Sequence, residues 1–339
     1  MAIKSVPILI CPNCGGPLTL QEIDQCSCEQ CGRDYPVTLG IPDLRPPEFI
    51  VKGHREVQVV EKLLDIYPSS DHLSLIKTFI SEIDNSEMPK HLVSFYQEHL
   101  INQVNRGAQF TDMFIERLES QYPLPDNRVA CEIGCGIGAG LLALSKHFDF
   151  VIGIDPDLAT LIVAKKLCEQ HHLENLLLIQ AIGQKLPFQA NSLSYITAQN
   201  TLEHIFEVDQ LMQEFARVLK KGGCFTADSR NRYDLFFSEP HVKLRWVGFL
   251  PRRWINAYVH WRIGMDYMKV HAQLLSYWDL RRALQRSFPN RWRILYPKAS
   301  AYGGSKRIDS LIDILSNLPG IAQAGLMIFP SHLALAQKQ

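Results

Sequence analysis

Residues 129–140 read Val129-Ala130-Cys131-Glu132-Ile133-Gly134-Cys135-Gly136-Ile137-Gly138-Ala139-Gly140. A short apolar run of this kind is typical of a buried strand, and the glycines that follow are typical of a turn into a helix. Glycines let a ligand approach the backbone closely, and the first N–H groups of a helix have no partner inside the helix. The stretch therefore predicts a ligand-binding loop on an α/β sheet.

Two acidic residues indicate which ligand this loop holds. Gly134, Gly136 and Ala139 also satisfy the dinucleotide signature G-x-G-x-x-A. Glu132 would repel a pyrophosphate, whereas it suits S-adenosylmethionine, which carries an ammonium and a sulfonium and no phosphate. Asp155 ends the next predicted strand, where a carboxylate can accept both ribose hydroxyls. The residues favour S-adenosylmethionine over a dinucleotide as cofactor.

Short apolar runs continue on both sides of this loop and alternate with helix-like segments. The pattern predicts a parallel sheet built from right-handed crossover units. The predicted strands are 129–133, 150–154, 176–179, 193–197 and 224–227, followed by a helix at 278–288, a strand at 292–296, a helix at 308–318 and a last strand at 326–336. Upstream, residues 56–120 have apolar residues at three- and four-residue spacing, which predicts several amphipathic helices.

At these residues the chain resembles the class I S-adenosylmethionine-dependent methyltransferases, of the type 11 group, over about 126–235 and the final helices and strands. Glu132, Gly134, Gly136 and Gly138 match the first motif of the family, and Asp155 matches its ribose-binding acid. Three further segments match later motifs in family order: Leu186-Pro187-Phe188, Asn200-Thr201-Leu202-Glu203-His204 and Leu219-Lys220-Lys221-Gly222-Gly223. The resemblance implies a Rossmann-like sheet of seven strands and S-adenosylmethionine as cofactor.

One position departs from the family pattern. In many relatives an Asp that binds the adenine amino group lies four residues before L-P-F, but here that residue is Ile182. We expect adenine to be held by backbone groups near Ile182 and Gly183 and by apolar packing from Leu158. Asn200, in the segment after the fourth predicted strand, completes the expected cofactor-binding set.

The N-terminal segment contains two Cys-x-x-Cys-Gly knuckles, Cys11 to Gly15 and Cys28 to Gly32. Each knuckle presents two thiolates from a tight turn, and four sulfurs complete a tetrahedral zinc shell. We expect structural zinc on Cys11, Cys14, Cys28 and Cys31, with Cys26 as the alternative to Cys28. Redox-active or unpaired thiols are the other interpretations. Since four sulfurs leave no open coordination position, the predicted role is folding and docking.

Residues 236–275 interrupt the strand and helix rhythm and predict an insertion after the fifth strand. The insertion is basic, with six Lys or Arg against Glu239 and Asp266, and it is rich in aromatic residues. The basic residues are Lys243, Arg245, Arg252, Arg253, Arg262 and Lys269, and the aromatic ones include Trp246, Phe249, Trp254, Tyr258 and Trp261. One interpretation is a lid with cationic groups for a phosphate or carboxylate of the substrate. The other is a packing helix that buries Trp254, Tyr258 and Trp261.

Two histidines are candidate catalytic bases. Methyl transfer to a hydroxyl requires alignment of the nucleophile and a group that takes its proton. His241 is the first candidate and His204 the second, because imidazole titrates near neutral pH. The segments Glu239-Pro240-His241 and Gly248-Phe249-Leu250-Pro251-Arg252 resemble those of methyltransferases encoded with bacterial cell-surface glycan biosynthesis.

The 339 residues divide into a zinc ribbon at 1–46, a helical extension at 47–125 and a methyltransferase domain at 126–339 that contains the insertion. Lys plus Arg number 35 and Asp plus Glu number 35, so nucleic acid is an unfavoured partner. No apolar stretch is long enough to span a bilayer, and the expected location is the cytoplasm. Peripheral membrane contact is allowed, and the oligomeric state is left open.

The sequence favours an S-adenosylmethionine-dependent methyltransferase that acts on oxygen of a small molecule, a sugar or a lipid-linked glycan. One alternative is a ribosomal RNA base methyltransferase, because large-subunit rRNA guanine-N1 methyltransferases also join a zinc ribbon to this fold. A second alternative is a non-catalytic scaffold, because Tyr35-Pro36-Val37 and Gly40-Ile41-Pro42 resemble small ribbon proteins that dock on methyltransferases.

Overall fold

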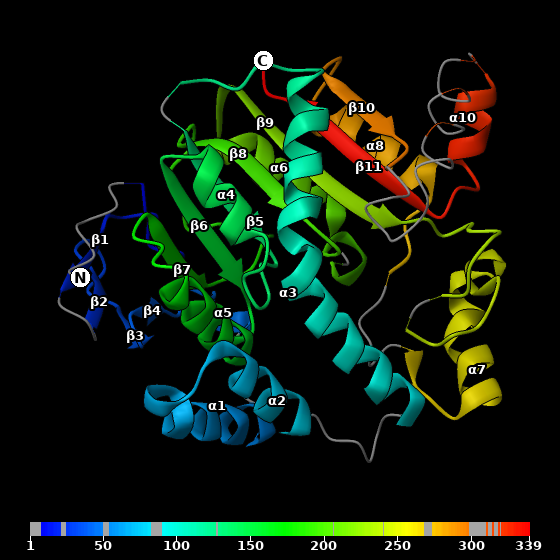
Figure 1. The fold of residues 1–339 in the computed structure, drawn as a ribbon. Coiled ribbons are helices and arrows are strands. Elements are labelled where there is room, and N and C mark those ends of the chain that lie inside the picture. The colour runs from blue at the N-terminus through cyan, green and yellow to red at the C-terminus, as the bar shows by residue number, and fades with distance from the viewer. Residues whose placement is uncertain are drawn as a thin grey trace.

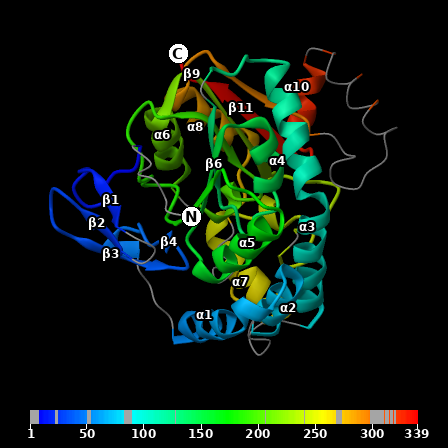
Figure 2. The same ribbon diagram turned by 60° about the vertical axis from the view of Figure 1, so that its left-hand side comes forward.

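The computed structural model describes residues 8–21, 25–49, 54–82, 90–126, 128–205, 207–239, 241–267, 273–297, 310, 314, 318 and 320–339. A central sheet carries helices on both faces, with a small N-terminal sheet at one edge (Figures 1 and 2). Of the predicted helix at 308–318, only three residues lie within the described part of the chain. Pro240 and Lys269 of the insertion also lie outside the described residues.

The central sheet has seven strands in the order β10-β11-β9-β8-β5-β6-β7. Strands β5 to β9 pair in parallel, and β11 runs antiparallel to both β9 and β10. The bounds are β5 Val129–Ile133, β6 Phe150–Asp155, β7 Leu176–Gln180, β8 Leu193–Ala198, β9 Leu219–Arg230, β10 Trp292–Leu295 and β11 Ser331–Gln337. The expected seven-stranded class I methyltransferase sheet is confirmed.

Two predicted boundaries were wrong. The last strand begins at Ser331 and not at Leu326, which ends helix α10 (Ile321–Leu326). The backbone carbonyls of residues 326, 327 and 329 accept hydrogen bonds from the side chain of Asn231, so this run is a capped turn although its composition is that of a strand. The fifth strand begins at Leu219 and not at Cys224, so the segment Leu219–Gly223 lies within β9, where the pairing with β8 shifts register.

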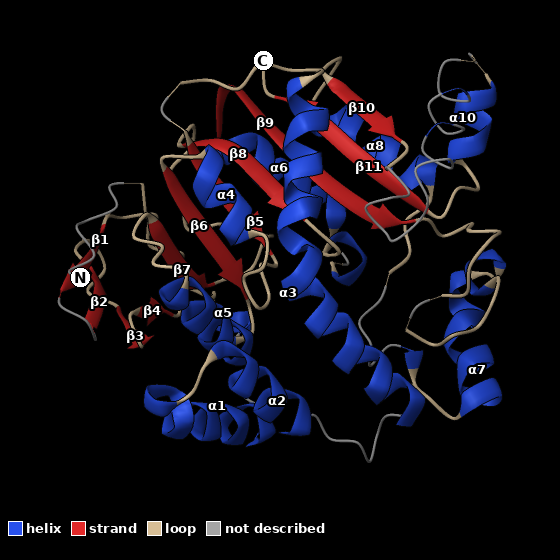
Figure 3. Cartoon of the chain, in the orientation of Figure 1, coloured by secondary structure: helices blue, strands red, loops and turns tan. Residues whose placement is uncertain are grey.

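Helices cover both faces of the sheet, because both faces of its parallel strands are apolar. Helices α6 (Val208–Val218) and α8 (Tyr277–Ser287) share one buried cluster with the sheet. Helices α3 (Lys90–Glu119), α4 (Leu141–His147) and α5 (Leu158–Gln170) contribute to the cluster on the other face (Figure 3). Helices α1 (His54–Ile66) and α2 (His72–Glu82) pack on α5, so the predicted helical segment is confirmed.

The N-terminal segment, here called the cysteine module (residues 8–46), forms a four-stranded antiparallel sheet at the β7 edge of the central sheet (Figure 1). Its strands are β1 Leu18–Gln21, β2 Gln25–Cys28, β3 Asp34–Thr38 and β4 Ile41–Pro42, and the 3-10 turn η1 (Pro47–Phe49) follows. Leu44 N–H donates to the Gln180 carbonyl at 2.8 Å, and Ile10 N–H donates to the Pro187 carbonyl at 2.9 Å. The module is therefore joined to the central sheet by backbone hydrogen bonds.

The insertion has its own small core. It contains the 3-10 turn η4 (Val247–Phe249) and helix α7 (Arg252–Ile263), which ends at Gly264 in the left-handed conformation. The buried face of α7 is Ile255 and Val259, while Trp254 is 55% and Trp261 74% exposed. The interpretation that these tryptophans form the buried face of a packing helix is therefore wrong. The 3.6-residue period allows only one side of a helix to be buried, and the smaller aliphatic residues occupy it.

A search of the described helices finds none that is long and apolar enough to cross a membrane.

Candidate functional site

The glycine loop leaves the carboxyl end of β5 and is held against β6. The N–H groups of Gly134 and Cys135 both donate to the Ile154 carbonyl, at 2.8 and 3.0 Å. Gly134 has a φ of 71°, and a Cβ there would overlap the hydroxyl of Thr201. A Cβ on Gly138 would lie 2.9 Å from that of Ala164 on α5. These two glycines are therefore required by packing and backbone conformation.

Gly136 differs from its neighbours. Its φ is 49°, and a Cβ built on it would meet no described heavy atom within 4 Å. The residue is also partly exposed, unlike Gly138. Open space over a glycine backbone is what close approach of a ligand requires. Gly136 is therefore the point of the loop best suited to contact a cofactor.

Glu132 is a buried acid beneath this loop. Only 4% of its surface is exposed, its carboxylate lies against Gly140, and its Oε2 has no hydrogen-bond partner in the described residues. Burial, and next the charge of Asp155, raise the pKa of Glu132 to about 8. A buried carboxylate without a partner is costly, and a cationic ligand group would supply the missing interaction.

Asp155 ends β6 and links the loop to the start of α5. Its Oδ2 accepts from Gly136 N–H and its Oδ1 from Asp157 N–H, both at 2.9 Å. Burial raises the pKa of Asp155. Each carboxylate oxygen has a second lone pair, so both can still accept from hydroxyl groups. The structure thus brings together Glu132, Gly136 and Asp155, three of the residues expected to bind the cofactor.

The three residues expected near adenine lie in different environments. Leu158 is the first residue of α5 and is half-buried. Ile182 is 8% exposed, and a Cβ on the buried Gly183 would overlap Leu211 and approach Ile133. Gly183 therefore serves close packing of the loop after β7 against β5 and α6.

Asn200 follows β8 and has a φ of 48°. Its N–H donates to Asp228 Oδ1 at 2.7 Å, and the neighbouring Thr201 hydroxyl donates to the Ile133 carbonyl at 3.1 Å. Sequence reasoning missed Thr201 and Asp228 as supports of this segment. The signal for Asp228 was available, because it is an acid that directly follows the apolar run 224–227.

The two candidate bases lie side by side. The ring centroids of His204 and His241 are 5.3 Å apart, with the ring planes nearly perpendicular. His241 is 8% exposed and its Nδ1 lies 2.6 Å from Glu239 Oε1, while Glu239 Oε2 accepts from Val242 N–H at 2.7 Å. Glu239 thereby fixes the orientation of the ring and leaves Nε2 for another partner.

The charges around His241 and its burial have opposite effects on its pKa. Burial alone would lower the pKa of His241, but the hydrogen bond to Glu239 and the charges of Glu239 and Glu203 raise it overall. Glu203 is 3% exposed, burial raises its pKa, and its Oε2 has no hydrogen-bond partner within the described ranges. Sequence reasoning did not assign roles to Glu203 and Glu239, although the Glu-x-His spacing was visible. His204 is exposed.

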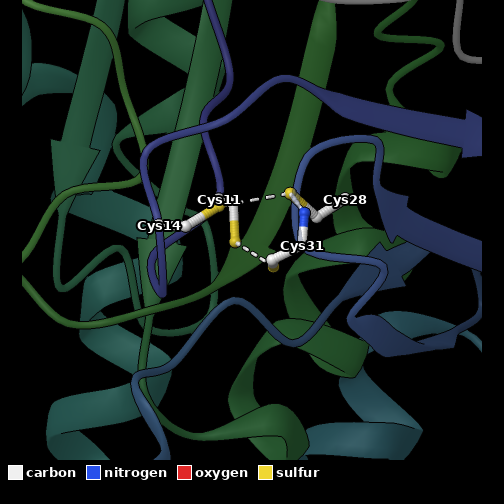
Figure 4. A group of neighbouring side chains, drawn as sticks. All are labelled: Cys11, Cys14, Cys28 and Cys31. Carbon is white, nitrogen blue, oxygen red and sulfur yellow. Dashed lines mark hydrogen bonds between the residues drawn. The ribbon is translucent and has the colours of Figure 1, made fainter.

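A second group of chemistry-bearing residues lies in the cysteine module. Cys11, Cys14, Cys28 and Cys31 place their sulfurs within 4.8 Å of one another (Figure 4). The Sγ atoms of Cys11 and Cys31 are 3.8 Å apart and those of Cys14 and Cys28 are 3.5 Å apart. Tetrahedral zinc with Zn–S bonds of about 2.3 Å separates its sulfurs by about 3.8 Å. The four thiols fit a zinc ion.

Cys26 does not belong to this group of sulfurs, although it is fully buried. It faces the core shared with the central sheet, and burial raises the pKa of its thiol to about 11. The positions of the sulfurs thus favour Cys28 over Cys26 as the fourth cysteine of the group.

The strand order, the glycine loop and the acid at the end of β6 define an α/β protein of class I methyltransferase architecture. Residues 131–227 match the family model described as a methyltransferase domain. Residues 131–227 are therefore similar to the methyltransferase domain family, and the sheet has the class I methyltransferase architecture.

Curated relatives match only part of the chain. The uncharacterized methyltransferase YcgJ of Bacillus subtilis is 33% identical over 94 residues, which are 28% of this chain and 37% of that protein. A ubiquinone/menaquinone biosynthesis C-methyltransferase of Campylobacter jejuni is 32% identical over 32% of this chain and 46% of its own length. A ubiquinone biosynthesis O-methyltransferase of Coxiella burnetii is 31% identical over 40% of this chain and 53% of its own length. The chain therefore spans about half or less of these relatives.

The solved structures that align with this chain are more distant in sequence. The crystal structure of YcgJ from Bacillus subtilis aligns with a TM-score of 0.42 at 18% identity, over 67% of this chain and 98% of that one. Phosphoethanolamine N-methyltransferase 2 of Haemonchus contortus, in complex with S-adenosyl-L-methionine, aligns with a TM-score of 0.46 at 16% identity, over 67% of this chain and 52% of that one.

Proposed function

We propose that this protein transfers a methyl group from S-adenosylmethionine to an oxygen of a small molecule, a sugar or a lipid-linked glycan. The observation that carries the proposal is the buried Glu239–His241 pair beside His204, on the loops that follow β8 and β9. Transfer to oxygen needs a positioned base, and this pair is built as one. The family match ends at residue 227, before the insertion, so the acceptor has to be argued from this chain's own residues.

The cofactor supplies an electrophilic methyl group on a sulfonium. Glu132 would hold the cationic amino acid portion, since its buried Oε2 has no partner among the residues described. Gly134, Gly136 and Gly138 shape the loop, and Asp155 would accept the ribose hydroxyls. The adenine side would be formed by Leu158, Ile182, Gly183 and Asn200.

In the proposed reaction His241 removes the proton of the acceptor hydroxyl. Glu239 holds His241 Nδ1–H, so the lone pair of the neutral ring is on Nε2 and is available to accept the proton. As the ring becomes an imidazolium, the charges of Glu239 and Glu203 stabilise it. His204, which packs edge-on against His241, is a second candidate and would position the ring or the acceptor.

The test is His241→Ala, with His260→Ala as its matched control, because His260 is an exposed histidine of α7. Loss of a general base lowers turnover by about 10² to 10⁴-fold, so we expect a loss in this range for His241→Ala. Binding of S-adenosylmethionine, measured by calorimetry, should be retained in both variants. Unchanged turnover in His241→Ala would remove this residue from the mechanism.

The calorimetry and one added measurement address the two other functions raised by the sequence. A chain that fails to bind S-adenosylmethionine would be the non-catalytic scaffold. A salt-sensitive shift of ribosomal RNA in a gel would favour the RNA base methyltransferase, because phosphate contacts are weakened by salt.

We further propose that Cys11, Cys14, Cys28 and Cys31 bind a structural zinc ion. The proposal includes the division into a ribbon at 1–46, a helical extension at 47–125 and a catalytic domain at 126–339 with a lid at 236–275. The four-stranded antiparallel sheet of the module and its four neighbouring sulfurs support the zinc site. The proposed setting is the cytoplasm, with a small-molecule or glycan acceptor, no nucleic acid, and peripheral membrane contact allowed.

A further inference from the structure

A pocket lies between the end of β9 and the insertion, next to the proposed base. It is lined by Arg230, Asn231, Arg232, Asp234, Phe237, Ser238, Glu239, Trp246, Val247, Gly248 and Leu274. Glu239 is shared between the pocket wall and the pair with His241. A molecule in this pocket would therefore lie beside Glu239, the residue that holds the proposed base.

Three of the four charged side chains in the wall make hydrogen bonds with other groups of the protein. The Arg232 guanidinium donates to the Gly248 carbonyl at 2.7 Å and to the Leu250 carbonyl at 2.9 Å. Asp234 Oδ1 accepts from the N–H groups of residues 236 and 237. Glu239 accepts from His241 and from Val242 N–H. These contacts hold the three side chains in place and shape the pocket.

Arg230 is different. It is the last residue of β9 and is partly exposed, and its guanidinium has no hydrogen bond or ion pair with any described residue. Its charge acts on Glu203, His241 and Lys243 only through space. A guanidinium offers five donors in a planar fork, which matches a phosphate or carboxylate. The Arg230 guanidinium is partly buried, has no hydrogen-bond partner among the described residues and lies near the proposed base, so it is suited to bind an anionic group of a ligand.

We propose that Arg230 binds an anionic group, a phosphate or a carboxylate, of the methyl acceptor. This inference rests on the proposed function and makes it more specific: the acceptor is an anion whose hydroxyl reaches His241 while its charged group sits at Arg230. Phe237 and Trp246, which are 60% and 58% exposed, form the outer wall and suit an apolar or sugar portion next to the anion. A soluble sugar phosphate and a lipid phosphate share this chemistry.

Calorimetric titration with inorganic pyrophosphate, without methyl transfer, tests the site directly. We expect the wild-type chain to bind pyrophosphate and Arg230→Gln to bind it at least about tenfold more weakly, because a charge-assisted bidentate contact is lost. Arg253→Gln is the matched control, since Arg253 is an exposed arginine of α7 outside the pocket wall, and it should bind like the wild type. Arg230→Lys keeps the charge without the fork and should fall between the two.

Two further arms distinguish the sources of the anion: glucose 1-phosphate in solution, and phosphatidylcholine vesicles with and without phosphatidic acid. Stronger binding to either one identifies the source and supports the proposal. Absence of pyrophosphate binding in the wild-type chain, or equal binding by Arg230→Gln and wild type, would overturn it. Because no turnover is measured, this result is independent of the His241→Ala test, and thermal melting of each variant confirms folding.

Discussion

The cysteine module and the insertion are both additions to the same sheet, but they are attached in opposite ways. The module lies at the β7 edge and shares one buried cluster with the sheet, to which it contributes Leu9, Cys26 and Leu44. The insertion follows β9 and has a separate core that includes Val242, Val247 and Val259. In Figure 1 the module and α7 lie on opposite sides of the molecule.

The two regions also differ in whether their arginine side chains have hydrogen-bond partners. In the module the buried Arg45 guanidinium is paired with Asp43 at 2.9 Å and donates to the Pro156 carbonyl at 3.3 Å, next to Asp155. At the end of β9, just before the insertion, Arg230 has no such partner among the described residues, and in the insertion Trp254 and Trp261 are exposed. An addition whose polar groups are satisfied supports the fold, and one that leaves them open is suited to recognise a ligand.

The largest effect is expected from the metal site. Cys28→Ser should lose the zinc ion and several kcal/mol of stability, because metal binding and folding of a small module are coupled. Cys26→Ala is the matched control and should keep one zinc per chain. Zinc content by mass spectrometry and denaturant unfolding measure this. Zinc retained by Cys28→Ser and lost by Cys26→Ala would reverse the ligand assignment.

A somewhat smaller effect is expected from the buried ion pair of the module. Arg45→Met leaves Asp43 buried and unpaired, which should cost about 3–5 kcal/mol of stability. Affinity for S-adenosylmethionine should also fall several-fold, because Arg45 holds the backbone next to Asp155. The double variant Asp43→Leu/Arg45→Met should recover much of the stability. A double variant as unstable as the single one would contradict this account.

On the insertion side, Glu239→Gln should change activity more than stability. Glu239 raises the pKa of His241, and a base acts only when it is unprotonated, so removing the charge should move the acidic limb of the pH profile to lower pH. Turnover should fall about 10- to 100-fold, because the ring loses its orientation. Asp234→Asn, in the same pocket wall, should leave the limb in place. A profile that does not move would exclude Glu239 as the positioning residue.

In the central sheet, which carries both regions, Glu132 on β5 should make cofactor binding depend on pH. Its pKa of about 8 means that the carboxyl is mostly protonated at pH 7, and a cationic ligand favours the ionised form. Affinity for S-adenosylmethionine should therefore rise by up to about tenfold per pH unit as the pH increases toward 8, and then level off. Calorimetry at several pH values measures this. Glu132→Gln should abolish the dependence and the exposed Glu174→Gln should preserve it; a dependence that survives in Glu132→Gln would refute the assignment.

The smallest effect is expected at the exposed face of α7. Trp261→Ser should change stability by less than about 0.5 kcal/mol, because the side chain is 74% exposed. Val259→Ala, on the opposite and fully buried face, should cost about 2 kcal/mol. Thermal melting compares the two. A large destabilisation by Trp261→Ser would mean that this face is covered in solution, for example by a second copy of the chain.

Features that depend on local pattern were predictable from the sequence. Apolar runs followed by glycines gave the strands and the loop after Ile133, because a buried strand and a positive φ at Gly134 each impose a residue type on their own position. The two Cys-x-x-Cys-Gly knuckles were visible for the same reason, since each turn sets its own spacing.

Features that depend on which face of an element is buried were not predictable. The sequence suggested two opposite roles for Trp254 and Trp261, and only packing showed that Ile255 and Val259 form the core. The start of β11 was misplaced because the turn at 326–329 is held by Asn231, a residue about 95 positions away along the chain.

The sequence by itself determined the sheet, the cofactor loop, the cysteine knuckles and the two candidate histidines, because each is written in residues that are close together along the chain. Only the tertiary structure decided that His204 lies against His241, that Arg45 is satisfied while Arg230 is open, and that the module shares the core of the sheet while the insertion does not. These are outcomes of long-range packing, in which a polar group's role depends on which neighbours the fold brings within hydrogen-bonding distance.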